Sequence, residues 1–227
     1  MKYKGILLDI DNTLYSYNEA HHAAVKSVVK HFRNEFNLDE KIITSCYENA
    51  RKKVHIDLIG TAASHNRLLY IQKMCEFFEI NPLKHSYKIF KLYMDNYLNN
   101  LKPYDGVYDL LEKYKNNICF VTDLTSDIQY RKIEKLKLDN YCKLIVTSEE
   151  AGNEKPHSYI FMLALQKLNL NNHEVCMIGD NFNKDIIGAN NLNIDAIWFN
   201  HNKNDDSNYN YQNIKIVSNF KQILELV

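Results

Sequence analysis

The chain has 227 residues, of which 45% are hydrophobic and 12% aromatic, enough for one large domain or a domain with a sizeable insertion. Its 28 basic and 28 acidic residues cancel, so no overall positive charge favours binding to a nucleic acid polymer. No segment approaches the ~20 consecutive apolar residues that cross a bilayer, the N-terminus does not resemble a signal peptide, and the five cysteines contain no C-x-x-C pair. We therefore expect a cytoplasmic protein, a monomer or a homodimer, with no membrane partner, no zinc site and no disulfides.

Short apolar segments without polar alternation predict buried strands at residues 5–10, 118–122, 144–147, 175–179, 196–199 and 214–217. Helical patterns separate several of the later strands, at residues 126–138, 157–168 and 184–191. Buried strands that alternate with amphipathic helices indicate a parallel sheet covered on both faces. The sequence thus predicts an α/β fold with a Rossmann-like, doubly wound sheet, whose ligands bind at the carboxyl ends of the strands.

One long interval breaks this alternation. Between about Tyr15 and Asn100 only helical periodicity is found, as in the four-residue spacing of Ala20, Ala24 and Val28. We interpret residues 15–100 as a helical cap domain inserted into a catalytic core made of residues 1–14 and 101–227. The Asn-rich stretch at 200–213 is expected to be a solvated loop without a functional role.

Two carboxylates follow the first predicted strand, Asp9 and Asp11. Burying two negative charges together is costly unless a cation or a phosphoryl group uses them, and carboxylate oxygens suit a hard ion such as Mg²⁺. The alternative is a loop in which Asp and Asn side chains stabilise turns. This segment alone predicts a metal or phosphate site without excluding a purely structural role.

Polar side chains also lie at the ends of later strands. Asp180 follows the strand at 175–179, where it could bind a metal, and Asp185 could orient a metal ligand or cap a helix. Thr122 ends another strand, where its hydroxyl and the following backbone N–H groups could bind a phosphate. Lys155 precedes a proline at a predicted strand-to-helix junction, and an isolated lysine is more often solvated surface.

Taken together, these motifs resemble the haloacid dehalogenase (HAD)-like hydrolases over nearly the whole chain. Asp9-Ile-Asp11-Asn-Thr13 is similar to the first motif of that family, D-x-D-x-T, and Thr122 to the second. Lys155-Pro156 is similar to the third motif, and Gly179-Asp180 with Asp185 to the fourth. The helical insertion between the first and second motifs resembles the C1-type cap of the small-molecule phosphatase branch.

The resemblance implies a phosphatase that requires Mg²⁺ and cleaves a small phosphorylated metabolite, such as a nucleoside monophosphate or a sugar phosphate. Asp9 would attack phosphorus to form an aspartyl-phosphate, and Asp11 would act as general acid and then general base. Mg²⁺ would be bound by Asp9, the backbone carbonyl of Asp11, and Asp180, with Asp185 behind them. Thr122 and Lys155 would bind the phosphoryl oxygens.

Position 11 separates reaction types within the family, because a leaving halide needs no proton and dehalogenases lack an aspartate there. Asp11 thus favours phosphate transfer over dehalogenation, and Asn12-Thr13 in place of Gly-Val favours hydrolysis over mutase chemistry. Asp123 stands in the phosphate loop where many relatives carry Asn, and the sequence leaves open whether its carboxylate points away. A dehalogenase and a catalytically silent phosphate-binding or scaffold protein remain the alternatives.

Four further polar residues of the insertion were considered for substrate contacts: His21, His22, His65 and Arg67. A packing or surface role is favoured for the two histidines that follow the first motif. For Arg67 an exposed position on a helix is expected, although an arginine there could meet an anionic leaving group.

Overall fold

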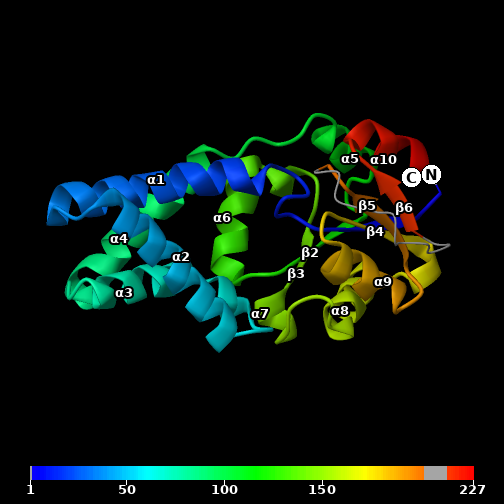
Figure 1. Cartoon of the computed structure of the whole chain (residues 1–227). Coiled ribbons are helices and arrows are strands. Elements are labelled where there is room, and N and C mark those ends of the chain that lie inside the picture. Colours follow the sequence, from blue (N-terminus) through cyan, green and yellow to red (C-terminus); the bar gives the residue numbers. More distant parts are fainter. Residues whose placement is uncertain (1, 202–213) are drawn as a thin grey trace. The chain divides into compact units, whose positions relative to one another are not determined.

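The computed structural model describes residues 2–201 and 214–227, so the predicted Asn-rich loop lies almost entirely outside the described residues. The chain forms two compact units (Figure 1). One consists of Met1–Ser16 with Lys102–Val227 and is called the sheet unit below; the other, Tyr17–Leu101, is called the helical unit.

The sheet unit is built on six parallel strands in the order β3-β2-β1-β4-β5-β6. Their bounds are β1 Gly5–Leu8, β2 Ile118–Thr122, β3 Leu144–Thr147, β4 Val175–Gly179, β5 Asp195–Phe199 and β6 Ile214–Val217. β1 lies between β2 and β4, and Leu8 is in register with Phe120 of β2 and Ile178 of β4. This confirms the doubly wound parallel sheet, and it brings the carboxyl ends of β1, β2 and β4 to one edge.

Helices cover both faces of this sheet, which explains why its central strands are apolar on both sides. They are α5 Val107–Lys113, α6 Ser126–Leu136, α7 Ser148–Ala151, α8 Ser158–Leu168, α9 Ile187–Asn190 and α10 Phe220–Leu226. On one face Phe161 of α8 joins Leu7 and Met177 in the hydrophobic core. On the other face Phe220 of α10 packs on Phe199 of β5, with ring centroids 5.1 Å apart. Figure 1 shows α5 and α10 on one side of the strands and α8 and α9 on the other.

The helical unit contains α1 Tyr17–Phe36, α2 Glu40–Asp57, α3 Arg67–Phe77 and α4 Pro82–Asn99, with a 3₁₀ turn at Ala62–His65. Asp39, Asn66 and Asn81 cap the N-termini of α2, α3 and α4 by accepting hydrogen bonds from backbone N–H groups. The absence of strands predicted for this interval holds for every described residue of the unit. No helix in the described parts of the chain is both long and apolar enough to span a membrane.

The two ends of the inserted segment are held together within the sheet unit. Tyr15 forms an antiparallel bridge with Pro103, and the backbone N–H of Tyr104 donates to the carbonyl of Leu14 at 2.9 Å. The chain thus leaves the sheet unit after β1 and returns to it beside the point of departure.

Candidate active site

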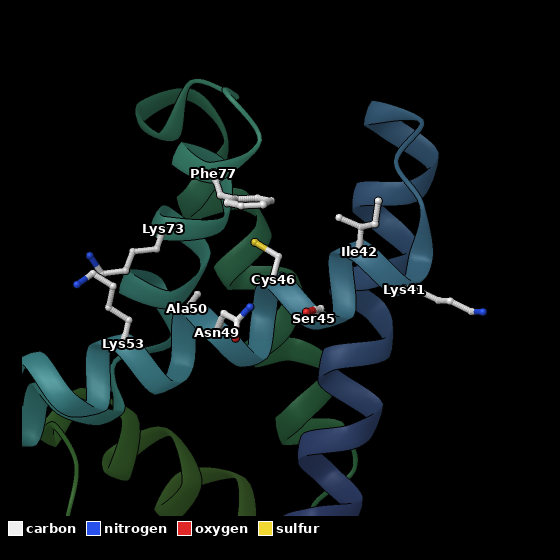
Figure 2. Close-up of a pocket in the computed structure, with 9 residues that line it drawn as sticks. All are labelled: Lys41, Ile42, Ser45, Cys46, Asn49, Ala50, Lys53, Lys73 and Phe77. Carbon is white, nitrogen blue, oxygen red and sulfur yellow. The ribbon is translucent and has the colours of Figure 1, made fainter.

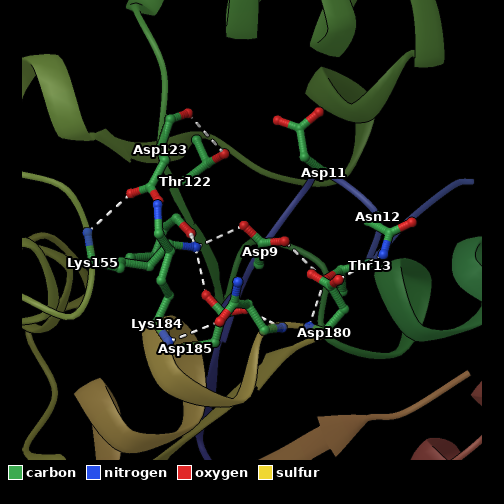
Figure 3. A network of polar contacts seen from close by, with 12 residues as sticks. Asp9, Asp11, Asn12, Thr13, Thr122, Asp123, Lys155, Asp180, Lys184 and Asp185 are labelled. Carbon is green, nitrogen blue, oxygen red and sulfur yellow. Dashed lines mark hydrogen bonds and ion pairs between the residues drawn. The ribbon is translucent and has the colours of Figure 1, made fainter. Parts of the chain in front are cut away.

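The edge formed by the carboxyl ends of β1, β2 and β4 collects the predicted site residues (Figure 3). Asp9 follows β1, Thr122 ends β2 and Asp180 follows β4. Lys155 reaches the same edge from the segment between α7 and α8. The order of the strands therefore brings Asp9 close to Thr122 and Asp180, which lie more than a hundred residues further along the sequence.

The carboxylate of Asp9 is buried and held at both oxygens. Oδ1 accepts a hydrogen bond from Nζ of Lys155 at 2.7 Å, and Oδ2 accepts one from the hydroxyl of Thr13 at 2.8 Å. The same Thr13 oxygen accepts a hydrogen bond from the backbone N–H of Asp180 at 3.0 Å. Thr13 therefore ties the loop after β1 to the loop after β4, which fixes the orientation of the Asp9 carboxylate.

Lys155 is 4% exposed, in contrast to the solvated position usual for a lysine. Besides Asp9, its ammonium group lies 2.6 Å from Oδ1 of Asp185 and donates to the carbonyl of Val121 at 2.8 Å. Burial alone would lower the pKa of this amine, but the charges of Asp185 and Asp9 raise it well above its usual range. Lys155 is therefore a permanent cation among these carboxylates.

Asp9, Asp180 and Asp185 form a cluster in which one oxygen from each lies within 4.8 Å of the others. Burial raises the pKa of all three carboxyls, and their mutual repulsion raises it further, whereas the charge of Lys155 lowers it. The cluster therefore holds three carboxylates, two of them buried, and the single ammonium group of Lys155 pairs with Asp9 and Asp185. A set of oxygen donors with surplus negative charge is what a hard divalent cation binds, so the residues present fit such an ion.

The position of Asp185 depends on Gly179, the last residue of β4. A Cβ atom at Gly179 would lie 2.4 Å from Oδ2 of Asp185, which is too close for any other residue type. Asp185 also accepts a hydrogen bond from the backbone N–H of Asn181 at 2.9 Å, while Asn12 donates to Asp180 at 2.6 Å. The Gly-Asp pattern at the end of β4 is thus a packing requirement of the acidic cluster.

Asp11 lies apart from this cluster, and its carboxylate points away from Asp9 in Figure 3. Nζ of Lys132 lies 2.6 and 2.7 Å from its two oxygens, and Gln129 donates to Oδ2 at 2.8 Å. Burial alone would raise the pKa of the Asp11 carboxyl, but the charge and hydrogen bonds of Lys132, with those of Tyr15 and Gln129, hold it well below its usual range. In this structure Asp11 is therefore an ionised partner of Lys132.

Asp123 is paired on both of its carboxylate oxygens. Oδ2 lies 2.8 Å from Nζ of Lys184, which also contacts Glu154 at 3.0 Å, and Oδ1 accepts from the backbone N–H of Lys155 at 3.0 Å. The carboxylate beside the phosphate loop is thus compensated by a cation. The hydroxyl of Thr122 accepts a hydrogen bond from Gln129 at 2.6 Å.

Three residues that contact Asp11 or Asp123 are not indicated by the motifs of the sequence: Gln129, Lys132 and Lys184. Lys132 is fully buried although it lies in α6, where a lysine is normally expected at the surface. Gln129 and Lys132 stand three residues apart, on one face of the helix that follows the second motif. A polar pair at this spacing among the apolar positions Ile128 and Ile133 is the available sequence signal.

The polar residues considered in the insertion all lie in the helical unit. His21 is buried and bonds through Nδ1 to the hydroxyl of Tyr93 at 2.8 Å, whereas His22 is exposed. The expectation of an exposed Arg67 is wrong, because its side chain is 6% exposed. The segment Ala62–His65 turns the chain so that α3 begins with Arg67 among the aromatic residues of α1 and α4.

A separate groove of about 450 Å³ lies between α2 and α3 of the helical unit. Figure 2 shows Phe77, Cys46 and Ile42 at one end of it and the ammonium groups of Lys53 and Lys73 at the other. It contains none of the predicted site residues. Ile42 is 54% exposed there, whereas the neighbouring Ile43 is buried.

The geometry above can be compared with known proteins. The family model of haloacid dehalogenase-like hydrolases matches residues 6–199, a range that runs from the second residue of β1 to the end of β5 and includes the whole acidic cluster. The chain belongs to the haloacid dehalogenase-like hydrolases. A relative from Halopiger xanaduensis, ribulose-1,5-bisphosphate 5-phosphatase, is 32% identical over 89% of this chain and 87% of its own length.

Other known proteins are similar over comparable lengths. Pyrimidine 5'-nucleotidase YjjG of Escherichia coli is 25% identical over 88% of this chain and 87% of its own. The crystal structure of a HAD phosphatase from Thermococcus onnurineus superposes with a TM-score of 0.75 at 19% identity, covering 100% of this chain and 97% of that one. At that identity, the structural likeness supports the fold alone.

Proposed function

We propose that this protein is a Mg²⁺-dependent phosphatase that hydrolyses small phosphomonoesters through an aspartyl-phosphate on Asp9. The observation that carries the proposal is the cluster of Asp9, Asp180 and Asp185 at the edge of the sheet, in which Lys155 pairs with Asp9 and Asp185. Relatives named as phosphatases of small phosphorylated molecules support the reaction class, a hydrolase acting on phosphoric monoesters.

Asp9 is the proposed nucleophile. Thr13 and Lys155 hold its two oxygens in a fixed orientation, which reduces the entropy lost when a carboxylate approaches phosphorus. Attack forms the bond between a carboxylate oxygen and phosphorus while the bond from phosphorus to the alkoxide breaks. Lys155 offsets part of the repulsion between the anionic nucleophile and the anionic ester.

Asp11 is the proposed acid for the leaving alkoxide and the base for the water that hydrolyses the acyl phosphate. The ion pair with Lys132 stabilises the ionised form, which is the form required of a base. Donation of a proton requires the neutral form. We therefore propose that Asp11 separates from Lys132 and takes up a proton from water before it protonates the leaving group.

Mg²⁺ would be bound by Asp9, Asp180 and the backbone carbonyl of Asp11, with Asp185 orienting the site through its contact with Lys155. When bound, the ion supplies positive charge that favours the ionised carboxylates and offsets the charge of the phosphoryl group. The surplus of carboxylates over cations in this cluster supports the assignment.

Thr122, Lys155 and the backbone of Asp123 are the proposed phosphate-binding groups. The Asp123 carboxylate is paired with Lys184, so it presents less uncompensated charge to an incoming dianion. We also propose that the helical unit is the cap that selects the leaving group. The substrate would be a small phosphorylated metabolite, of nucleoside monophosphate or sugar phosphate type, in the cytoplasm, where five free buried cysteines stay reduced.

Phosphate release from p-nitrophenyl phosphate and a panel of phosphorylated metabolites tests this proposal. We expect release with Mg²⁺ and none after chelation by EDTA. A protein that binds Mg²⁺, stays folded and releases no phosphate from any ester of the panel would contradict the assigned reaction and favour a catalytically silent member of the family.

A further inference from the structure

The helical unit contains a buried arginine that the proposed reaction does not use. Arg67 is the first residue of α3 and is 6% exposed. Its Nη1 donates to the carbonyl of His65 at 2.5 Å and its Nη2 to the hydroxyl of Tyr17 at 3.1 Å. Its guanidinium carbon also lies 5.8 Å from the ring centroid of Tyr17, within the range of a cation–π contact.

No carboxylate pairs with Arg67 among the residues that the structure describes. A guanidinium group has five N–H donors and a permanent positive charge, and the two contacts given above are to neutral oxygens. Burying a cation without an opposite charge is costly, and arginines at such sites normally pair with carboxylate or phosphate. The contacts of Arg67 thus leave its charge uncompensated.

The groups around this guanidinium are uncharged hydrogen-bonding side chains. His21 stacks on Tyr17 with ring centroids 5.1 Å apart and bonds to the Tyr93 hydroxyl. Burial, with the nearby charges of Arg51 and Arg67, lowers the pKa of His21 to about 3, so its ring is neutral at physiological pH. These side chains therefore offer Arg67 polar contacts and no opposite charge.

Tyr47 supplies an independent sign that a partner is missing. Its side chain is fully buried, and its hydroxyl has no hydrogen-bond partner within the described residues. The ring lies 5.9 Å from His21 and 6.2 Å from Tyr70, centroid to centroid, so it belongs to the same cluster. A buried hydroxyl without a partner costs free energy that a ligand oxygen would recover.

The backbone adds to the positive potential. Arg67 stands at the N-terminus of α3, where the helix dipole is positive and cations are disfavoured. A cation at this end of an 11-residue helix is repelled by the helix that carries it. An oxyanion beside Arg67 would compensate the side chain and the helix end together.

We propose that Arg67 and Tyr47 form part of a binding site, within the helical unit, for the phosphate or carboxylate group of a small molecule. Two sources share this chemistry: a second anionic group on the substrate itself, or a separate anionic metabolite that regulates the protein. The first source rests on the proposed phosphatase function, and the second does not.

The side-chain Nε–H signals of arginine in a ¹H–¹⁵N spectrum give a direct test on the full-length protein. The chain has four arginines, so the Arg67 signal can be assigned by its loss in Arg67→Lys. On titration with inorganic phosphate, and with butanediol bisphosphate, we expect a saturable shift of the Arg67 signal. Arg33, an exposed arginine of α1, should not shift.

Kinetics separate the two sources. If the substrate carries the anion, Arg67→Met should raise KM for butanediol bisphosphate about tenfold or more, as expected from loss of a charge-assisted hydrogen bond. The KM values of Arg67→Met for butanediol monophosphate and p-nitrophenyl phosphate should change by less than about twofold. Arg33→Met serves as the matched control. If a separate metabolite binds, the Arg67 signal shifts with phosphate while the KM values stay the same.

An Arg67 signal that is unmoved by millimolar phosphate and by the bisphosphate would overturn the proposal, whether or not Arg67→Met folds. Failure of the phosphatase assignment has a different signature. In that case no ester is hydrolysed, while the Arg67 signal still responds to phosphate.

Discussion

Each of the two units buries charge, with opposite sign. At the sheet edge the ammonium group of Lys155 pairs with Asp9 and Asp185, and Asp180 adds a third carboxylate to the cluster. In the helical unit a guanidinium, that of Arg67, contacts neutral oxygens and has no carboxylate partner among the described residues. Both arrangements are costly in the absence of a ligand, so each predicts a ligand of the opposite sign: a cation at the sheet edge and an anion at Arg67.

A third buried charge shows what a compensated arrangement looks like. Asp11 and Lys132 pair with one another at 2.6 and 2.7 Å, and Gln129 satisfies a further lone pair of Asp11. This pair is balanced within the protein. Burial of charge alone therefore does not indicate a ligand site, whereas an imbalance between buried charges does.

The largest expected effect is at the sheet edge. Asp9→Asn should lower kcat for phosphate release by about 10⁴-fold or more, ~5 kcal/mol in activation free energy, because the amide is not a nucleophile. The fold should persist, since the amide oxygen can still accept from Lys155 or Thr13. Steady-state assays with Asp109→Asn, an exposed aspartate of α5, provide the control. Turnover by Asp9→Asn within tenfold of the wild type would rule out the nucleophile assignment.

The next largest effect is expected on stability, when the ion pair of Asp11 and Lys132 is broken. Lys132→Met should lower the free energy of unfolding by about 3 kcal/mol, because it leaves the mostly buried Asp11 carboxylate without its cation. Lys135→Met, at an exposed position of the same helix, should change it by less than about 0.5 kcal/mol.

The double variant Asp11→Asn with Lys132→Met should recover part of that loss. Urea unfolding of the wild type, of the two single variants Asp11→Asn and Lys132→Met, and of the double variant measures the coupling. Strictly additive effects would show that the pair is not the source of the stability. If Lys132 also positions Asp11 for proton transfer, Lys132→Met should slow hydrolysis of alkyl phosphates more than that of p-nitrophenyl phosphate, whose leaving group needs no proton.

Asp180→Asn should change which of two proteins, variant or wild type, is the more stable when Mg²⁺ is added. Without metal the variant should be at least as stable as the wild type, because it removes one of the three carboxylates that repel one another in the cluster. With Mg²⁺ at 100 times its Kd the wild type should gain about 2.7 kcal/mol, and the variant much less. Thermal unfolding with Mg²⁺ and with EDTA measures both. Equal stabilisation of the two proteins by Mg²⁺ is the result that places the ion elsewhere.

The smallest effect concerns pH and the helical unit. The pKa of His21 is lowered to about 3 from 6.5, so the unfolded chain takes up a proton that the folded chain does not. Stability should therefore fall as pH drops below 6.5, by at most about 1.4 kcal/mol per pH unit from this residue. The charged and titratable groups facing His21 are Arg51, Arg67, His22, Tyr17, Tyr47 and Tyr93.

Urea unfolding of wild type and His21→Gln between pH 7 and about pH 4.5 isolates this contribution, since other acid-sensitive groups are common to both proteins. The difference in unfolding free energy should change in favour of the variant as the pH falls. A difference that is independent of pH would mean that His21 is not held neutral by the fold.

Much of the sheet unit was predictable because its central strands are buried on both faces. The bounds of β2, β3 and β4 are those expected from the apolar runs, and the carboxyl-end rule then brings Asp9, Thr122 and Asp180 together. Lys155 was identified through the family resemblance, because a lone lysine carries no local signal of burial.

Positions set by tertiary contacts were not predictable in this way. Lys132 and Arg67 belong to residue types that are normally exposed. The spacing of Lys132 from Gln129 is the one local signal for Lys132, and nothing in α3 marks Arg67 as buried. Of the neighbours Ile42 and Ile43 only Ile43 is buried, and helical spacing defines a face only to within one residue. The pairing of Asp123 with Lys184 joins residues 61 apart, so it required the structure.

The bridge between Tyr15 and Pro103 also bears on how such a chain diversifies. Because the two ends of the helical segment meet there, joined further by the hydrogen bond from Tyr104 to Leu14, the sheet unit does not rely on that segment for closure. A short turn, or a different set of helices, can span the same gap at little cost in chain entropy. The sequence of the inserted segment can therefore change while the order of strands that brings Asp9, Thr122 and Asp180 together is retained.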